Sequence, residues 1–226
     1  MSKNIIITGT SSGIGLELAK FFIKNKHNVL AISRNNSDLR SLNLKCLYAV
    51  DFDITDYERY NSLNKYLNNF ENVDVLINNA GLLVNKPFED TSLEDFQKVY
   101  STNVFSVAML TKFLIKRMNN RSNVVNISSI GGVEGTLKFP GLAAYSSSKG
   151  ALNILTEMLA EEYKEQGIHF NSLALGSVQT KMLNKAFPGF KASTSAQDMA
   201  KYIYDFSMEG YKLINGKVIS ISSTTP

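Results

Sequence analysis

Short runs of apolar, often β-branched residues alternate with longer amphipathic stretches along nearly the whole chain. The apolar runs are almost uninterrupted, which is typical of strands whose two faces are both covered by helices. Strands and helices that alternate in this way predict an α/β fold, with a doubly wound parallel sheet of about seven strands and right-handed crossovers. The expected strands are Asn4–Thr8, Asn28–Ile32, Cys46–Val50, Val73–Ile77, Asn123–Ile127, Ile168–Ala174 and Lys217–Ile221.

The amphipathic stretches between these strands predict the helices. They are Gly13–Asn25, Asn36–Ser41, Tyr57–Asn69, Leu93–Asn119, Ala143–Gln166 and Ala196–Phe206. Two helix starts carry the spacing of a capping box, Thr55 with Glu58 and Thr91 with Glu94. No internal repeat, low-complexity segment or linker divides the sequence, so we expect one domain over residues 1–226.

The composition argues against several classes of protein. The 24 Lys and Arg against 20 Asp and Glu give a net charge of +4, too small to predict nucleic-acid binding without a clustered basic stripe. The single cysteine, Cys46, excludes an intramolecular disulfide, and the distant His27 and His169 suggest no metal site. Neither a membrane-spanning run nor a secretory signal is evident, so we expect a cytoplasmic protein with no membrane partner.

Three glycines fall within seven residues at the junction of the first strand and the first helix: Gly9, Gly13 and Gly15. Glycines at this position permit a tight turn and bring the helix amides close to a pyrophosphate. An ordinary turn is the alternative, but the position favours nucleotide binding. The spacing departs from the common dinucleotide fingerprint, and the missing Gly-Lys-Ser/Thr ending disfavours nucleoside triphosphate hydrolysis.

Ser33 and Arg34 follow the second strand, where an NAD site commonly has a carboxylate for the adenine ribose. The nearest acid is Asp38. A carboxylate would repel a 2′-phosphate, whereas an arginine can bind it through charge-assisted hydrogen bonds. The sequence therefore predicts that NADP(H) is preferred over NAD(H), with a solvated loop arginine as the alternative.

Tyr145 and Lys149 lie four positions apart in a predicted helix and therefore on nearly the same face. A free tyrosine titrates near ~10, and a neighbouring ammonium favours the phenolate. Such a pair offers an acid and a base without histidine. The spacing is common by chance, so the pair needs support from its context.

That context is a set of motifs in a fixed order: Thr8-Gly9 with Gly13-Ile14-Gly15, Asp53-Ile54, Asn78-Asn79-Ala80-Gly81, Asn103, Ser129, and Tyr145 with Lys149. Together they resemble the short-chain dehydrogenase/reductase family, in its ordinary single-domain branch. The resemblance covers about Lys3 to Ser220 and implies a Rossmann-type, NAD(P)-binding domain. It implies cofactor contacts from Gly9, Ser11, Ser12, Gly13, Ile14, Gly15, Arg34, Asp53, Ile54, Asn79, Ala80, Gly81, Tyr145, Lys149, Val178 and Thr180.

The resemblance also implies the catalytic roles. Tyr145 would exchange a proton with the substrate oxygen, and Lys149 would hold the nicotinamide ribose and lower the tyrosine pKa. Ser129 would orient the carbonyl, because it matches the family position better than Ser128. Asn103 would hold a water that links Lys149 to solvent. The implied activity is that of an NADPH-dependent carbonyl reductase or alcohol dehydrogenase.

The sequence leaves several substrates and two oligomeric states possible. A 3-oxoacyl thioester, a small ketone, a sugar or a steroid-like compound would fit this catalytic set, and no metal is implied. A non-catalytic NADP(H)-binding regulator or scaffold is the alternative function. By analogy, the helices Leu93–Asn119 and Ala143–Gln166 would form the contact of a homodimer or homotetramer.

The sequence departs from the family pattern in three places. Leu175 replaces a common proline before Gly176, which leaves the strand exit less constrained. The segment between Ser129 and Tyr145 is longer than usual, and it either tunes specificity or is a neutral insertion. The segment between Thr180 and Ser195 is short, which predicts an open cleft for a long or carrier-bound substrate unless a partner subunit closes it.

Overall fold

The computed structural model describes residues 2–223; Met1 and the last three residues, which the one-domain prediction includes, lie outside this range. A seven-stranded sheet with the order β3-β2-β1-β4-β5-β6-β9 forms the centre, and all its pairings are parallel. The predicted doubly wound α/β fold is thereby confirmed. Its strands are β1 (Asn4–Thr8), β2 (Asn28–Ser33), β3 (Leu47–Asp51), β4 (Val75–Asn78), β5 (Asn123–Ser129), β6 (His169–Leu175) and β9 (Lys217–Ile221).

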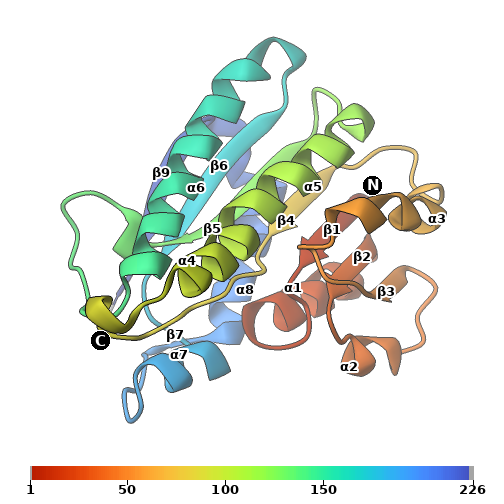
Figure 1. Cartoon of the computed structure of the whole chain (residues 1–226). Helices are drawn as coiled ribbons and strands as arrows, with labels where there is room; N and C mark the ends of the chain where they lie inside the picture. Colours follow the sequence, from red (N-terminus) through yellow and green to blue (C-terminus); the bar gives the residue numbers. More distant parts are fainter. Residues whose placement is uncertain (1, 224–226) are drawn as a thin grey trace.

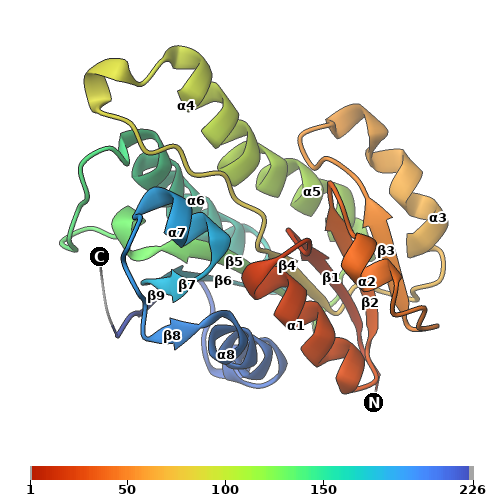
Figure 2. The same ribbon diagram turned by 90° about the horizontal axis from the view of Figure 1, so that it is seen from below.

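Helices cover both faces of this sheet (Figures 1 and 2). On one face α1 (Gly13–Lys24) packs against α8 (Ala196–Met208). The other face carries α4 (Leu93–Tyr100), α5 (Ser106–Leu114) and α6 (Ala143–Glu162). Shorter elements are α2 (Ser37–Arg40), α3 (Asn64–Leu67), α7 (Lys181–Ala186) and the two-stranded sheet of β7 (Val178–Gln179) and β8 (Thr194–Ser195).

The apolar strands serve two separate cores. Ile5 and Ile7 of β1 point into the cluster beneath α1 and α8, whereas Ile6 points into the cluster on the opposite face. Because successive side chains of a strand point to opposite faces, a strand buried on both sides must be apolar throughout. This explains why the strand positions could be predicted closely. None of the helices in the described part of the chain has the length and hydropathy that a membrane span needs.

The predicted long helix Leu93–Asn119 is confirmed as continuous helical backbone as far as Arg117, but it is not a uniform α-helix. A π-helical turn, η3 (Ser101–Phe105), lies between α4 and α5, and the 3₁₀ turn η4 (Ile115–Arg117) forms its end. The prediction for Tyr57–Asn69 is likewise corrected to the 3₁₀ helix η1 (Tyr57–Leu63) followed by α3.

The two predicted capping boxes are also wrong. At α4 the box is formed by Ser92 and Asp95, because the Thr91 hydroxyl donates instead to the Pro87 carbonyl oxygen at 2.9 Å. The Thr55 hydroxyl donates to Asp53 Oδ1 at 2.7 Å and caps no helix. In both cases the threonine hydroxyl donates to a nearby oxygen and does not cap the helix that the spacing predicts.

A buried polar chain joins the sheet to α6. Asn78 Nδ2 donates to Asn126 Oδ1 at 2.8 Å, and Asn126 Nδ2 donates to Thr156 Oγ1 at 2.9 Å. These three side chains are buried, so their polar groups satisfy one another in place of water. Asn78 therefore braces two strands, and its side chain faces away from the site described next.

Candidate active site

A cavity of about 1000 Å³ lies along the carboxyl ends of the parallel strands. In open α/β sheets this edge is where ligands bind, because the loops that leave the strands surround it. The cavity wall contains each residue that the resemblance assigned to cofactor binding: Gly9, Ser11, Ser12, Gly13, Ile14, Gly15, Arg34, Asp53, Ile54, Asn79, Ala80, Gly81, Tyr145, Lys149, Val178 and Thr180. Ser128 and Ser129 line it too, whereas Asn103 does not.

The glycine turn enters this cavity directly before α1. Gly9 and Gly13 have φ values of +73° and +59°, and a Cβ atom on Gly9 would lie 2.8 Å from Ala80 Cα. A Cβ atom on Gly15 would lie 2.3 Å from the Gly9 carbonyl oxygen. Side chains at Gly9 and Gly15 would thus clash with backbone atoms, so glycine lets the turn pack closely against the loop after β4 and against α1. The first turn of α1 has no side-chain cap and no acidic residue, so its amides suit a pyrophosphate.

Asn79 holds the glycine turn against the end of β4. Its Nδ2 atom donates to the carbonyl oxygens of Thr8 at 2.9 Å and Gly9 at 3.1 Å. The Thr8 hydroxyl in turn accepts from the backbone amides of Asn79 and Ala80. Asn79 thus lines the cavity and also fixes the turn that a pyrophosphate would contact.

Arg34 and Asp53 lie at the end of the cavity formed by the loops after β2 and β3. Burial raises the pKa of Asp53, but hydrogen bonds from the Thr55 amide and hydroxyl and the charge of Arg34 outweigh it and lower the pKa overall. Asp53 is thus an anion at neutral pH, held by Thr55. The Arg34 side chain is exposed, and in residues 2–223 no salt bridge includes it.

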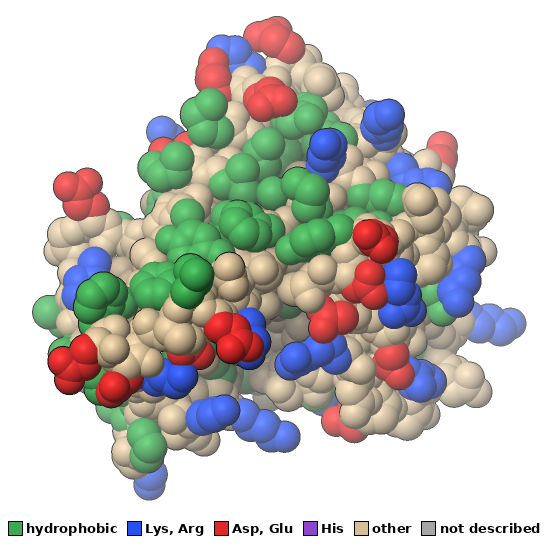
Figure 3. Space-filling model, viewed as in Figure 1, with side chains coloured by type: hydrophobic (Ala, Val, Ile, Leu, Met, Phe, Trp, Pro, Cys, Tyr) green, Lys and Arg blue, Asp and Glu red, His purple; other side chains and the backbone are tan. Residues whose placement is uncertain are grey.

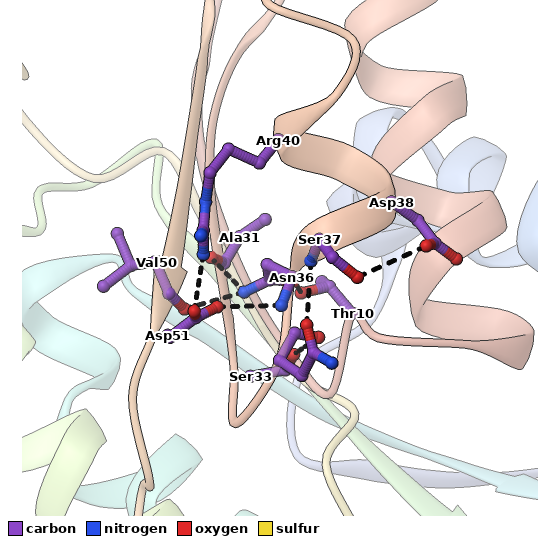
Figure 4. A network of polar contacts seen from close by, with 10 residues as sticks. Thr10, Ala31, Ser33, Asn36, Ser37, Asp38, Arg40, Val50 and Asp51 are labelled. Atoms are coloured by element: carbon purple, nitrogen blue, oxygen red, sulfur yellow. Dashed lines mark hydrogen bonds and ion pairs between the residues drawn. The ribbon is translucent and has the colours of Figure 1, made fainter.

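Asn36 anchors the loop that carries Arg34, and the sequence analysis missed it (Figure 4). The side chain is 1% exposed. Its Oδ1 accepts from the Thr10 hydroxyl at 2.6 Å, and its Nδ2 donates to the carbonyl oxygens of Ala31 at 3.1 Å and Val50 at 2.7 Å. Asn36 therefore joins the glycine turn to β2 and β3. The only signal in the sequence is an asparagine before a short helix, which is too common to single out.

We expect Asn36→Ala to destabilise the protein by about 2 kcal/mol, because the substitution leaves buried backbone and hydroxyl groups unpaired. It should also weaken NADPH binding, since the Arg34 loop loses its anchor. Chemical unfolding and a fluorescence titration with NADPH measure the two effects. Ser37→Ala is the matched control on the exposed side of the same loop. Equal unfolding midpoints for Asn36→Ala and the parent protein would contradict the anchoring role.

Ser129, Tyr145 and Lys149 meet on the cavity wall, at the junction of β5 and α6. Burial raises the pKa of Tyr145 above 10.0, and the Ser129 hydroxyl, which hydrogen-bonds to the phenol, opposes part of that rise. Lys149 Nζ lies 5.8 Å from the centroid of the Tyr145 ring. The expected lowering of the tyrosine pKa by Lys149 is therefore not found in this structure, in which burial dominates.

Lys149 is a buried lysine, with 3% of its surface exposed. Its Nζ atom donates to the Ile127 carbonyl oxygen at 2.8 Å. Burial lowers its pKa from 10.5 to about 8, because a charged amine is poorly solvated there. Ser128 supports the same segment, as its hydroxyl donates to the Lys149 carbonyl oxygen at 3.3 Å. The Ser128 hydroxyl thus bonds to the backbone.

Asn103 lies behind the cavity wall, in the π-helical turn η3. Its Nδ2 atom donates to the Leu82 carbonyl oxygen at 3.0 Å and to Ser148 Oγ at 2.9 Å, and its Oδ1 accepts from the Leu82 amide at 2.8 Å. Both side-chain hydrogens are thus used to tie the loop after β4 to α6. The side chain positions that loop, and the structure does not bring it into the cavity.

Known proteins resemble this chain in sequence. The model of the short chain dehydrogenase family matches residues 3–189. Carbonyl reductase [NADPH] 2 from Sus scrofa is 33% identical over 179 residues, which are 78% of this chain and 72% of that protein. The uncharacterized oxidoreductase YusZ from Bacillus subtilis is 32% identical over 228 residues, covering 96% of this chain and 80% of that protein.

Solved structures match along almost the whole chain. ElxO with NADP bound has a TM-score of 0.85 and 33% identity, and the match covers 98% of both chains. 4-Hydroxyisoleucine dehydrogenase complexed with NADH has a TM-score of 0.86 and 27% identity, and the match covers 98% of this chain and 97% of that one. The similar structures thus include one with NADP and one with NADH.

Proposed function

Because the chain belongs to the short-chain dehydrogenase family, we propose that it is an NADPH-dependent carbonyl reductase or alcohol dehydrogenase. It is an NAD(P)-dependent oxidoreductase that acts on CH–OH or C=O groups. The observation that carries the proposal is the meeting of Ser129, Tyr145 and Lys149 on the wall of the cavity into which the glycine turn opens. A site that only bound a nucleotide would need no half-buried proton donor beside a buried amine.

In the reduction, Tyr145 would donate its phenolic proton to the carbonyl oxygen. Ser129 would hydrogen-bond to the same oxygen and stabilise the charge that grows on it. When bound, the nicotinamide supplies the hydride that is added to the carbonyl carbon. Lys149 would hold the nicotinamide ribose, and Asn103 would hold the loop after β4 in place beside it. The cofactor residues named above would bind the rest of the dinucleotide.

The proposed reaction is tested by following NADPH oxidation with a panel of ketones, aldehydes and 3-oxoacyl thioesters, with NADH in parallel reactions. We expect turnover of at least one carbonyl class. Tight NADPH binding with no turnover across the panel would instead favour the regulator interpretation. A cytoplasmic location would fit this reaction, since the proposed cofactor circulates there.

NADP(H) preference is the finer part of the proposal, and it rests on Arg34. We expect Arg34→Asp to raise the dissociation constant of NADPH about 10- to 100-fold, since one charge-assisted contact with the 2′-phosphate is lost. The dissociation constant of NADH should change little. Fluorescence titrations measure both. Arg40→Ala is the control, because this arginine is paired with Asp51 on the outside of α2. Equal losses for both cofactors would argue against a 2′-phosphate contact.

We also propose a homodimer or homotetramer. Exposed apolar side chains, which include Phe105, Met109, Ile154 and Met158, gather over α4, α5 and α6. Figure 3 shows a continuous hydrophobic area there, facing the same way as in Figure 1. Contiguous apolar patches of this kind mark association surfaces more often than single exposed residues do. Sedimentation velocity measures the assembly directly.

A further inference from the structure

The longer loop between Ser129 and Tyr145 forms part of the cavity wall, to which it contributes Phe139 and Leu142. Phe139 of this loop and Phe187, directly after α7, make a T-shaped contact with ring centroids 5.7 Å apart. Both rings line the cavity. A neutral surface insertion would leave such a ring in solvent, so the structure favours the interpretation that this loop tunes specificity.

Hydrogen bonds tie the closing segments to the loop after β4. Asn85 Nδ2 donates to the Ala186 carbonyl oxygen at 2.7 Å, and the Lys86 amide donates to the Gly141 carbonyl oxygen at 3.0 Å. Gly141 has a φ of +86°, and a Cβ atom there would lie 2.1 Å from Asn85 Oδ1. Three loops thus meet in one roof. Phe139 and Phe187 narrow that end of the cavity, and the open cleft expected from the short Thr180–Ser195 segment stays a prediction.

The wall beneath this roof is apolar. The side chains that the three roof segments and η5 (Ile130–Gly132) place on the cavity wall include Leu83, Ile130, Phe139, Leu142, Leu183 and Phe187. The charged residues of the long loop do not reach it: Glu134 is exposed, and Lys138 Nζ donates back to the carbonyl oxygens of Val133 and Thr136.

Charged side chains line other parts of the cavity, and most of them lie at its far end or already have a partner. Arg34 and Asp53 belong to the far end, and Glu94 pairs with Lys98 on α4. Lys149 donates to Ile127. Lys181 remains, an exposed lysine at the first position of α7. Because Lys181 lines the cavity two positions before the wall residue Leu183, the test of the substrate class includes a variant without its charge.

We propose that the substrate is an uncharged carbonyl compound with a compact apolar group, aromatic or branched, that is enclosed beneath Phe139 and Phe187. This rests on the proposed reductase function and adds the substrate class to it. Apolar rings gain free energy when they leave water for such a wall, whereas an unpaired carboxylate buried there loses its hydration.

The test compares acetophenone with 4-acetylbenzoate, which has the same ring and ketone and one added carboxylate. With NADPH, we expect kcat/KM for acetophenone to be at least about 100-fold higher, since the wall side chains around Phe139 and Phe187 named above carry no charge to pair with the carboxylate. Phe139→Ala should lower kcat/KM for acetophenone about 10- to 100-fold. Leu137→Ala is the matched control, an exposed apolar residue of the same loop. Lys181→Met should leave acetophenone turnover unchanged.

Two outcomes separate the substrate class from the reductase function. Tyr145-dependent turnover that favours 4-acetylbenzoate and is lost in Lys181→Met would overturn the substrate class and leave the reductase function standing. If no carbonyl compound is turned over, the reductase function fails. Binding then still tests the apolar wall: adding 1-phenylethanol to the NADPH-bound protein should raise the melting temperature further for the parent protein and not for Phe139→Ala. No such shift in the parent protein would overturn the inference.

Discussion

Replacing Tyr145 with phenylalanine is expected to lower kcat for carbonyl reduction by about 10²- to 10⁴-fold, the usual contribution of a positioned proton donor. Phenylalanine keeps the ring that packs 5.8 Å from Lys149 Nζ and removes only the hydroxyl. NADPH affinity, measured by fluorescence titration, should therefore stay within a factor of about two of the parent value, because the other proposed cofactor contacts on the cavity wall remain.

Tyr163→Phe provides the control for this substitution. Tyr163 lies directly after the same helix, α6, and packs against Phe170 far from the cavity. Its replacement should change neither kcat nor NADPH binding. If Tyr145→Phe kept the parent rate, the phenol would not be the proton donor. If a biological effect of the protein persisted in Tyr145→Phe, the regulator interpretation would gain support.

The direction of the reaction should depend on pH through the same phenol. Burial raises the pKa of Tyr145 above 10.0, so at neutral pH the group is protonated. A protonated phenol can act as the acid for reduction, whereas alcohol oxidation needs the phenolate as base. The rate of oxidation should thus rise with pH towards that pKa, while reduction should not require high pH.

The sheet could be predicted closely because its signal is local. Each strand is buried on both faces, so its own residues had to be apolar, and β1 has the bounds predicted for it. The π-helical turn η3 could not be predicted from periodicity. It coincides with hydrogen bonds from Asn103 to Leu82 and Ser148, which are distant in sequence. Tertiary contacts of this kind override helix propensity.

The site likewise contains residues that short sequence patterns predict and residues that they do not. The glycine turn and the spacing of Tyr145 and Lys149 are short patterns, and the sequence alone brought them to one site. Asn36 and the contact between Phe139 and Phe187 depend on side chains that meet only after the chain has folded. A single residue that belongs to no spaced motif carries little information about its contacts, which is why these contacts were not predicted.

Lys149→Met is expected to abolish activity. At neutral pH, however, the free energy of unfolding of the variant should exceed that of the parent protein, and this difference should shrink at high pH. Methionine has similar length and carries no charge, so it suits a position that is 3% exposed. The pKa of Lys149 is lowered from 10.5 to about 8 by burial. That shift corresponds to about 3 kcal/mol of free energy that the charged amine costs the folded state.

The sign of the pH dependence follows from that shift. Between about pH 8 and 10.5 the unfolded chain holds a proton that the folded protein has released. Raising the pH removes this proton from the unfolded chain, so the parent protein gains stability relative to Lys149→Met. The advantage of the variant is thus fully present below about pH 8 and is lost as the pH approaches 10.5. The lost hydrogen bond to Ile127 subtracts a pH-independent amount of about 1 kcal/mol.

Urea unfolding of both proteins at pH 7, 8, 9 and 10 measures this difference, and taking the difference cancels the other titrating groups. Lys24→Met, an exposed lysine of α1, is the control and should show no such trend. A constant difference across the series would mean that Lys149 keeps its proton in the folded protein, and the amine would then be better solvated than its burial indicates. The expected trend would show that the protein keeps a destabilising lysine at the site where activity requires it, as functional residues often are kept at the expense of stability.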